Sequence, residues 1–168
     1  MRNRLEPQIE IAKRLYPEIM KLIKNYTEYC DENGDDDNSE YKKLENKLHK
    51  ITKKDISQYN LWEYWEEEGF EPLSFKIALP EPNIVNDITK EELIEIVKRI
   101  KEDIFEKNNN EDEFIQEFKY FLKDYYHELL EINYKDYTNE YFNRQKRKDG
   151  NYFEYTVEEI GEKILNKS

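Results

Sequence analysis

The sequence predicts an all-α protein, a helical bundle, on three observations. The 168 residues include only four glycines, and no segment repeats the alternation of Val, Ile and Thr that the strands of a large sheet require. Apolar residues instead recur every three or four positions along several segments, which is the spacing of an amphipathic helix. Aromatic residues make up 14% of the chain, so we expect a folded core rather than a disordered acidic chain.

The first half of the chain is expected to contain helices joined by polar loops. Residues 8–29 carry one apolar stripe, within which Pro17 marks either a kink or the first turn of a second helix. A polar loop is predicted over residues 30–40, and helices over 40–51 and 55–68. The buried side of the second of these helices would carry Ile56, Tyr59, Trp62 and Trp65. A short helix and an extended connection are then bracketed by Pro72, Pro80 and Pro82.

Two capping boxes predict helices in the second half. Thr89 and Glu92 stand three residues apart at the start of an apolar run, and Thr156 and Glu159 repeat this pattern. The first of these helices is expected to bury Leu93, Ile96, Val97, Ile100 and Ile104. The elements between the two are a long acidic helix over residues 111–132, a shorter tyrosine-rich element over about 136–145 and the polar loop RQKRKDGN.

The charge of the chain limits the classes of partner. A net charge of -12 gives a surface that repels nucleic acid and anionic membranes and attracts basic proteins. Cys30 is the single cysteine, which excludes an internal disulfide and fits a reducing compartment. The N-terminal residues MRNRLEPQIE contain no long apolar run. We therefore expect a cytoplasmic protein with no nucleic-acid or membrane partner.

Residues suited to catalysis are scarce. The two histidines, His49 and His127, lie far apart in the sequence and are interpreted as solvated or capping side chains. No base is expected beside Cys30, and the chain has no Gly-rich phosphate loop, HExxH or CxxC motif. The sequence therefore predicts a protein that is not an enzyme and has no catalytic residues, no cofactor and no metal.

The acidic loop resembles a calcium-binding loop in part. With Gly34 at the sixth position, the residues at the third, fifth, seventh, ninth and twelfth positions are Asp31, Asn33, Asp35, Asp37 and Glu40. The first position holds Tyr29, where an Asp is normally needed, and the eighth holds Asp36 in place of an aliphatic residue. A solvated loop is the favoured interpretation, and a calcium-responsive helical protein is kept as an alternative.

Tyrosines and acids are concentrated in residues 111–142, which contain nine acids and three lysines. On a helix, Tyr125 shares the core face with Phe121 and Leu129, whereas Tyr126 is offset by about a third of a turn and is expected to be exposed. Exposed tyrosines beside acids are typical of a protein-binding surface, and the alternative is that these rings only cover a small helical core. The predicted partner-binding residues are Glu113, Glu117, Asp124, Tyr126, Glu128, Glu131, Tyr134, Asp136, Tyr137, Tyr141 and Phe142.

The segment NDITKEELIEIVKRI is similar to the first helix of the colicin and pyocin immunity proteins, small four-helix proteins that inactivate bacterial toxins. The resemblance covers about residues 84–168 and extends to the order of the elements that follow. The third helix of that family typically has an Asp, two residues, two tyrosines and a Pro. Here Thr138 replaces the Asp, Phe142 follows Tyr141, and Asn143 replaces the Pro.

The resemblance implies a function. It implies an immunity protein of a bacteriocin or contact-dependent growth inhibition system, which neutralises a cognate toxin domain, expected to be a basic nuclease. Tyr141 and Phe142 would be its anchors, and the acids of the long helix would select the partner. Residues 84–168 would form the four-helix unit and residues 1–83 an added helical layer packed on it, in a protein that is a monomer when free. The alternative is an acidic nucleic-acid mimic that inhibits a defence nuclease.

Overall fold

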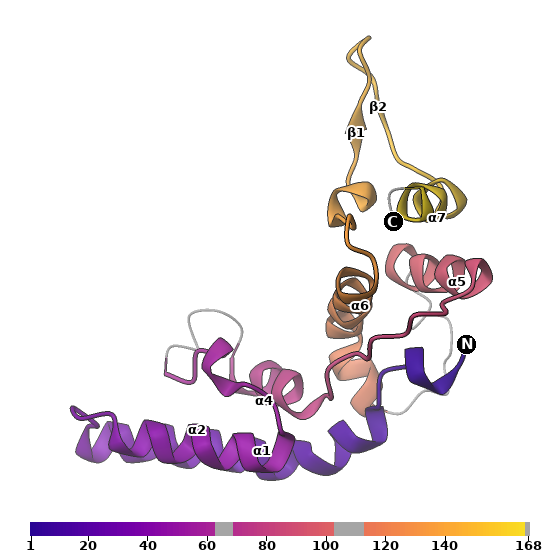
Figure 1. Cartoon of the computed structure of the whole chain (residues 1–168). Coiled ribbons are helices and arrows are strands. Elements are labelled where there is room, and N and C mark those ends of the chain that lie inside the picture. Colours follow the sequence, from indigo (N-terminus) through magenta and orange to yellow (C-terminus); the bar gives the residue numbers. More distant parts are fainter. Residues whose placement is uncertain (63–68, 103–112, 167–168) are drawn as a thin grey trace. The chain divides into compact units, whose positions relative to one another are not determined.

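The computed structural model describes residues 1–62, 69–102 and 113–166. The chain divides into two compact units, one formed by Met1–Glu6 with Pro82–Ser168 and the other by Pro7–Glu81. Both are built from helices, so the predicted all-α class is confirmed (Figure 1). Within the described residues, the strands are β1 (Gln145–Lys146) and β2 (Tyr152–Phe153), which form one short hairpin.

The unit of residues 7–81 is organised around the long helix α1 (Ile9–Asn33), which packs against α2 (Ser39–Thr52) and α4 (Phe70–Ala78). Pro17 lies inside α1, which is continuous, so its interpretation as the start of a second helix is wrong. The helices bury Ala12, Ile19, Ile23, Tyr26, Leu44, Leu48, Leu73, Phe75, Ile77 and Ala78.

Two predictions for this unit are wrong in detail. Helix α1 continues to Asn33, where the predicted loop had begun at residue 30, and it ends at Gly34, whose φ of 72° favours glycine. The helix predicted over residues 55–68 is wrong in its described part. Residues 56–58 form a 3-10 turn, η2 (Ile56–Gln58), in which the Asp55 side chain accepts a hydrogen bond from the Ser57 amide, and the backbone is extended at Tyr59. Trp62 is 42% exposed rather than buried, and Trp65 lies outside the described residues.

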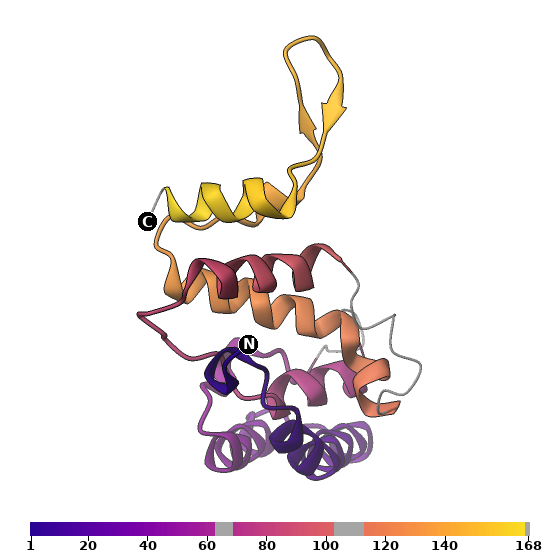
Figure 2. The ribbon, with the colours of Figure 1, turned by 90° about the vertical axis from the view of Figure 1, so that its right-hand side faces the viewer.

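The other unit contains α5 (Lys90–Lys101), α6 (Glu113–Asn133), the 3-10 helix η4 (Asn139–Phe142) and α7 (Val157–Leu165). Helix α5 contacts both α6 and α7, and the three lie side by side (Figure 2). Both predicted capping boxes are confirmed, with Thr89 and Glu92 at the start of α5 and Thr156 and Glu159 at the start of α7. Ile104, Glu111 and Asp112 lie outside the described residues.

The first six residues belong to this same unit. Leu5, in the 3-10 helix η1 (Asn3–Leu5), has no exposed surface. Arg2 donates hydrogen bonds to both carboxylate oxygens of Glu92, at 2.6 and 2.8 Å, and to Asp87 at 2.9 Å. This N-terminal segment, residues 1–6, is thus held by charged groups on the first turn of α5 and just before it.

Candidate partner-binding surface

Helix α6 has a buried face and an opposite, exposed one. Its buried residues are Phe118, Leu122, Tyr125, Tyr126, Leu129 and Leu130. Six of its exposed residues are spaced three or four apart, and we call them the acidic stripe: Glu113, Glu117, Tyr120, Asp124, Glu128 and Glu131. At 100° per residue these six positions fall within about 80° of the helix circumference. The stripe therefore presents five carboxylates and one aromatic ring in a single direction.

The predicted acids and the predicted rings have different environments. The acids are exposed, as a contact surface requires: Glu113, Glu117, Asp124, Glu128, Glu131 and Asp136. The expectation that the tyrosines are exposed is wrong for Tyr126, Tyr134 and Tyr141, which are 0%, 8% and 8% exposed. Tyr137 and Phe142 are half-buried. The rings that the family resemblance marks as anchors are therefore largely packed inside the unit.

Tyr126 is buried because the N-terminal segment covers it. Arg99 Nη1 donates a hydrogen bond of 2.6 Å to the Tyr126 hydroxyl, which in turn donates to Glu6 Oε2 at 3.1 Å. Arg99 also forms an ion pair with Glu6, and the Tyr125 hydroxyl donates to the Glu6 carbonyl oxygen at 3.2 Å. Burial, with the nearby Glu6 carboxylate, raises the pKa of Tyr126 and raises that of Tyr125 to about 12. No local pattern predicts this cluster, because Glu6 lies 120 positions away from Tyr126.

Tyr120 is the exposed ring that sequence reasoning missed. Its side chain is 59% exposed, and the Nζ atom of Lys119 lies 5.3 Å from its ring centroid. Its spacing in the sequence could have predicted this exposure. Tyr120 is three residues after Glu117 and four before Asp124, so it shares their helix face. Tyr120 therefore replaces Tyr126 as the aromatic element of the surface.

His127, Tyr137 and Phe142 form a small cluster beside the stripe. The Tyr137 hydroxyl is hydrogen-bonded to His127 Nδ1, and the Phe142 ring stands edge-on to the imidazole with ring centroids 5.0 Å apart. Burial lowers the pKa of His127, an effect that the Asp124 carboxylate opposes. Burial, together with Glu131, raises the pKa of Tyr137. The cluster therefore favours a neutral imidazole.

This cluster predicts a pH-dependent stability. Because the pKa of His127 is lower in the folded chain, the unfolded chain takes up the proton more readily, and stability is lost as pH falls below about 6.5. We expect His127→Gln to show a smaller decrease in the urea midpoint between about pH 7.5 and pH 5.5 than the wild type. Tyr152→Phe, which changes an exposed ring on the hairpin, should retain the wild-type decrease. Equal decreases in the wild type and His127→Gln would contradict the prediction.

The acidic loop of the other unit acts as a helix cap. Asp35 accepts hydrogen bonds from the backbone amides of Glu40, at 3.1 Å, and Tyr41, at 2.9 Å. Partial burial favours its protonated form, but these amides lower the pKa of Asp35 below its usual value. Asp31 and Asn33 lie in α1 rather than in a loop. In the part of the chain that the structure describes, no three His, Cys, Asp or Glu side chains are grouped to hold a metal ion.

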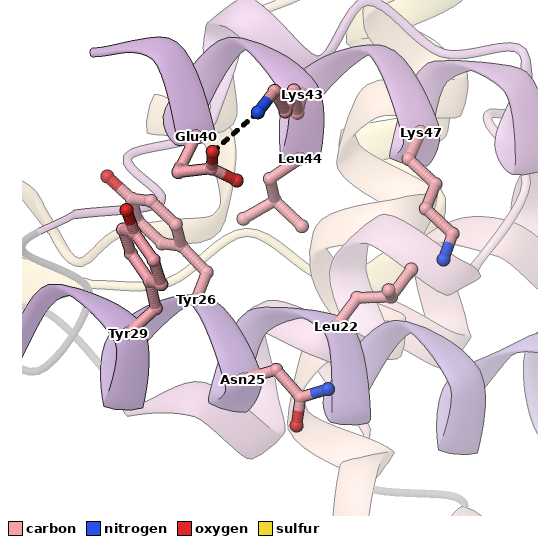
Figure 3. Close-up of a pocket in the computed structure, with 8 residues that line it drawn as sticks. All are labelled: Leu22, Asn25, Tyr26, Tyr29, Glu40, Lys43, Leu44 and Lys47. Carbon is pink, nitrogen blue, oxygen red and sulfur yellow. Dashed lines mark hydrogen bonds and ion pairs between the residues drawn. The ribbon is translucent and has the colours of Figure 1, made fainter. Parts of the chain in front are cut away.

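A groove of about 270 Å³ lies between α1 and α2 (Figure 3). Leu22 and Leu44 approach each other across it, with the rings of Tyr26 and Tyr29 at one end and Lys47 at the other. The carboxylate in its lining, Glu40, is paired with Lys43. The groove offers apolar contact area between the two helices.

Comparisons with protein-family models, with curated proteins and with solved structures yield no match. The resemblance to the immunity proteins therefore remains a prediction. Among the described helices, none has both the length and the apolar character needed to cross a bilayer.

Proposed function

We propose that this chain is a cytoplasmic immunity protein that binds and neutralises a basic bacterial toxin domain, of the kind used in bacteriocin or contact-dependent inhibition systems. The acidic stripe of α6 would be its contact surface and Tyr120 the aromatic anchor. The chain would act by binding, as a monomer when free, and without catalysis or a cofactor.

The observation that carries the proposal is an exposed ring within a row of carboxylates on one helix face. Tyr120 is 59% exposed, with Glu113 and Glu117 before it and Asp124, Glu128 and Glu131 after it. A tyrosine supplies contact area at a small cost in side-chain entropy, and tyrosines are enriched among the residues that dominate interface energies. Carboxylates around it would accelerate the encounter with a basic surface and disfavour acidic ones.

A nucleic-acid mimic is the second candidate, and charge density counts against it. The stripe runs from Glu113 to Glu131, a length of about 27 Å for 18 steps of 1.5 Å each. Duplex DNA of that length carries about 16 phosphates, one per 1.7 Å, whereas the stripe carries five carboxylates. The lower density and the ring between the acids favour recognition of a protein surface.

The function is tested by capture followed by rescue. The chain is used as bait in a lysate of its source cells, and a retained basic protein domain is then expressed alone and together with the chain. Relief of growth arrest by co-expression of the chain would support the proposal. A retained nuclease that duplex DNA displaces would support mimicry, and growth arrest that persists on co-expression would contradict neutralisation.

Tyr120 is the residue whose replacement tests the surface. We expect Tyr120→Ala to weaken binding of the captured partner by about 30-fold, or about 2 kcal/mol, because a hot-spot ring would be lost. Its melting temperature should change little, because the ring is 59% exposed. Tyr152→Ala is the matched control, since Tyr152 is 57% exposed but lies on the hairpin. An equal loss of affinity in both variants, measured by calorimetry, would contradict the assignment.

A further inference from the structure

The β1–β2 hairpin carries the opposite charge to the rest of the protein. Four of the five residues from 144 to 148 are cations, and all four are exposed: Arg144, Lys146, Arg147 and Lys148. This concentration occurs in a chain whose net charge is -12. The hairpin extends away from η4 and α7 in both views of the chain (Figures 1 and 2). Its surface is distinct from the acidic stripe, and its role is independent of the function proposed for the stripe.

Backbone hydrogen bonds hold the cations on an ordered support. Lys146 pairs with Tyr152 in the antiparallel register, and the Arg147 amide donates to the Asn151 carbonyl at 2.7 Å. The turn closes with the Gly150 amide donating to the Arg147 carbonyl at 3.0 Å, and Gly150 has a φ of 89° that favours glycine. At the base of the hairpin, Gln145 Nε2 donates to the carbonyl oxygen of Glu140 at 2.8 Å.

An exposed ring stands among these cations. Tyr152 is 57% exposed, with the guanidinium carbon of Arg144 at 5.4 Å and Lys146 Nζ at 5.9 Å from its centroid. Arg144 precedes β1 and lies two positions before Lys146, which is directly opposite Tyr152. The distances to the ring place both cations beside Tyr152. The hairpin therefore combines two cations beside an accessible ring with two further cations near the turn.

We infer that this hairpin binds single-stranded nucleic acid. Proteins bind single strands without sequence preference by pairing cations with phosphates and stacking bases on aromatic rings, and the hairpin presents both groups together. A carboxylate-rich polypeptide would use the cations but has no planar base to stack on Tyr152. Each base that stacks on the ring would keep its phosphates within reach of Arg144 and Lys146.

The net charge of the chain predicted no nucleic-acid partner, but that prediction averages over the whole surface. The hairpin residues 144–154 carry four cations against two acids, Asp149 and Glu154, so the charge next to a strand bound there is positive. The acids of the helices act from farther away, and their effect is screened as salt rises.

The test is fluorescence anisotropy with labelled oligothymidine and oligouridine of about fifteen nucleotides, titrated with the full chain at about 50 mM salt. We expect half-saturation at protein concentrations on the order of 10–100 µM and a slope of log K against log salt of about -3, as four phosphate contacts to a single strand require. Replacing all four hairpin cations by Gln should weaken binding at least about 10-fold.

Two controls separate nucleic-acid binding from general charge effects. Replacing Lys21, Lys24, Lys42 and Lys50 by Gln changes the net charge equally on exposed positions of α1 and α2, and it should leave binding within about 2-fold. Tyr152→Ser should weaken binding of the oligonucleotides but not of labelled polyglutamate. No binding by the wild type, an equal loss in the control variant, or polyglutamate binding as tight as that of the oligonucleotides would overturn the inference.

Discussion

Tyr126→Ala is expected to lower the free energy of unfolding by about 3–5 kcal/mol, the usual cost of truncating a buried aromatic ring. The ring has no exposed surface, and its removal would leave Arg99 and Glu6 without the hydroxyl that bridges them. Tyr126→Phe keeps the ring and loses only the hydroxyl, so its cost should be about 1–3 kcal/mol. The order of stability should be wild type, then Phe, then Ala.

The two units allow the effect to be located. Both tryptophans of the sequence fall within the residue range 7–81, where Trp62 is described by the structure, whereas Tyr126 belongs to the other unit. Urea unfolding followed by far-ultraviolet circular dichroism should shift in Tyr126→Ala, and Tyr120→Ala provides an exposed-ring control that should not shift. A shift confined to tryptophan fluorescence, or equal stability of Tyr126→Ala and the wild type, would contradict the role assigned to this ring.

Reversing charge on the acidic stripe should have the largest effect on binding. We expect Glu117→Lys combined with Asp124→Lys to weaken binding of the basic partner by at least about 100-fold, because two like charges would face the partner's cations. The association rate should decrease most at low ionic strength, where charge steering is least screened. Stopped-flow measurements at about 50 and 500 mM salt separate this effect from changes in dissociation.

The control for this experiment has the same net charge. Glu28→Lys combined with Glu32→Lys changes two exposed acids of α1, four residues apart. If the partner recognises the stripe, this variant should retain an affinity within a fewfold of the wild type. An equal loss in both double variants would mean that net charge alone drives association, and the stripe would lose its assigned role.

Several features of the fold follow from local chemistry and were predicted correctly. The capping boxes at Thr89 and Thr156 depend only on residues three positions apart, so the chain specifies them without tertiary contacts. The core face predicted for Tyr125 and Leu129 of α6 follows from their spacing of four residues, and both are buried. The exposure of the acids on its opposite face has the same origin, because charged side chains remain in water unless paired.

Other features were decided by contacts between distant parts of the chain. The width of the buried face of α6 depends on what packs beside it, and Glu6 with Arg99 extends that face to include Tyr126. The hairpin was predicted as a loop because its strands of two residues are too short to show a period-two pattern. Its cations and Tyr152 form one surface only because the pairing of β1 with β2 brings them together.

The sequence therefore specified most of the helical segments and the solvated acids of α6, since both depend on neighbours within one or two helical turns. The tertiary structure decided which rings remain available to a partner. Tyr126, Tyr134 and Tyr141 are largely buried, whereas Tyr120 and Tyr152 are exposed. For Tyr126 the physical reason is that its ring is buried with its hydroxyl bonded to Arg99 and Glu6, whereas an exposed ring keeps its hydroxyl in water. The choice between the two depends on residues far away in the chain.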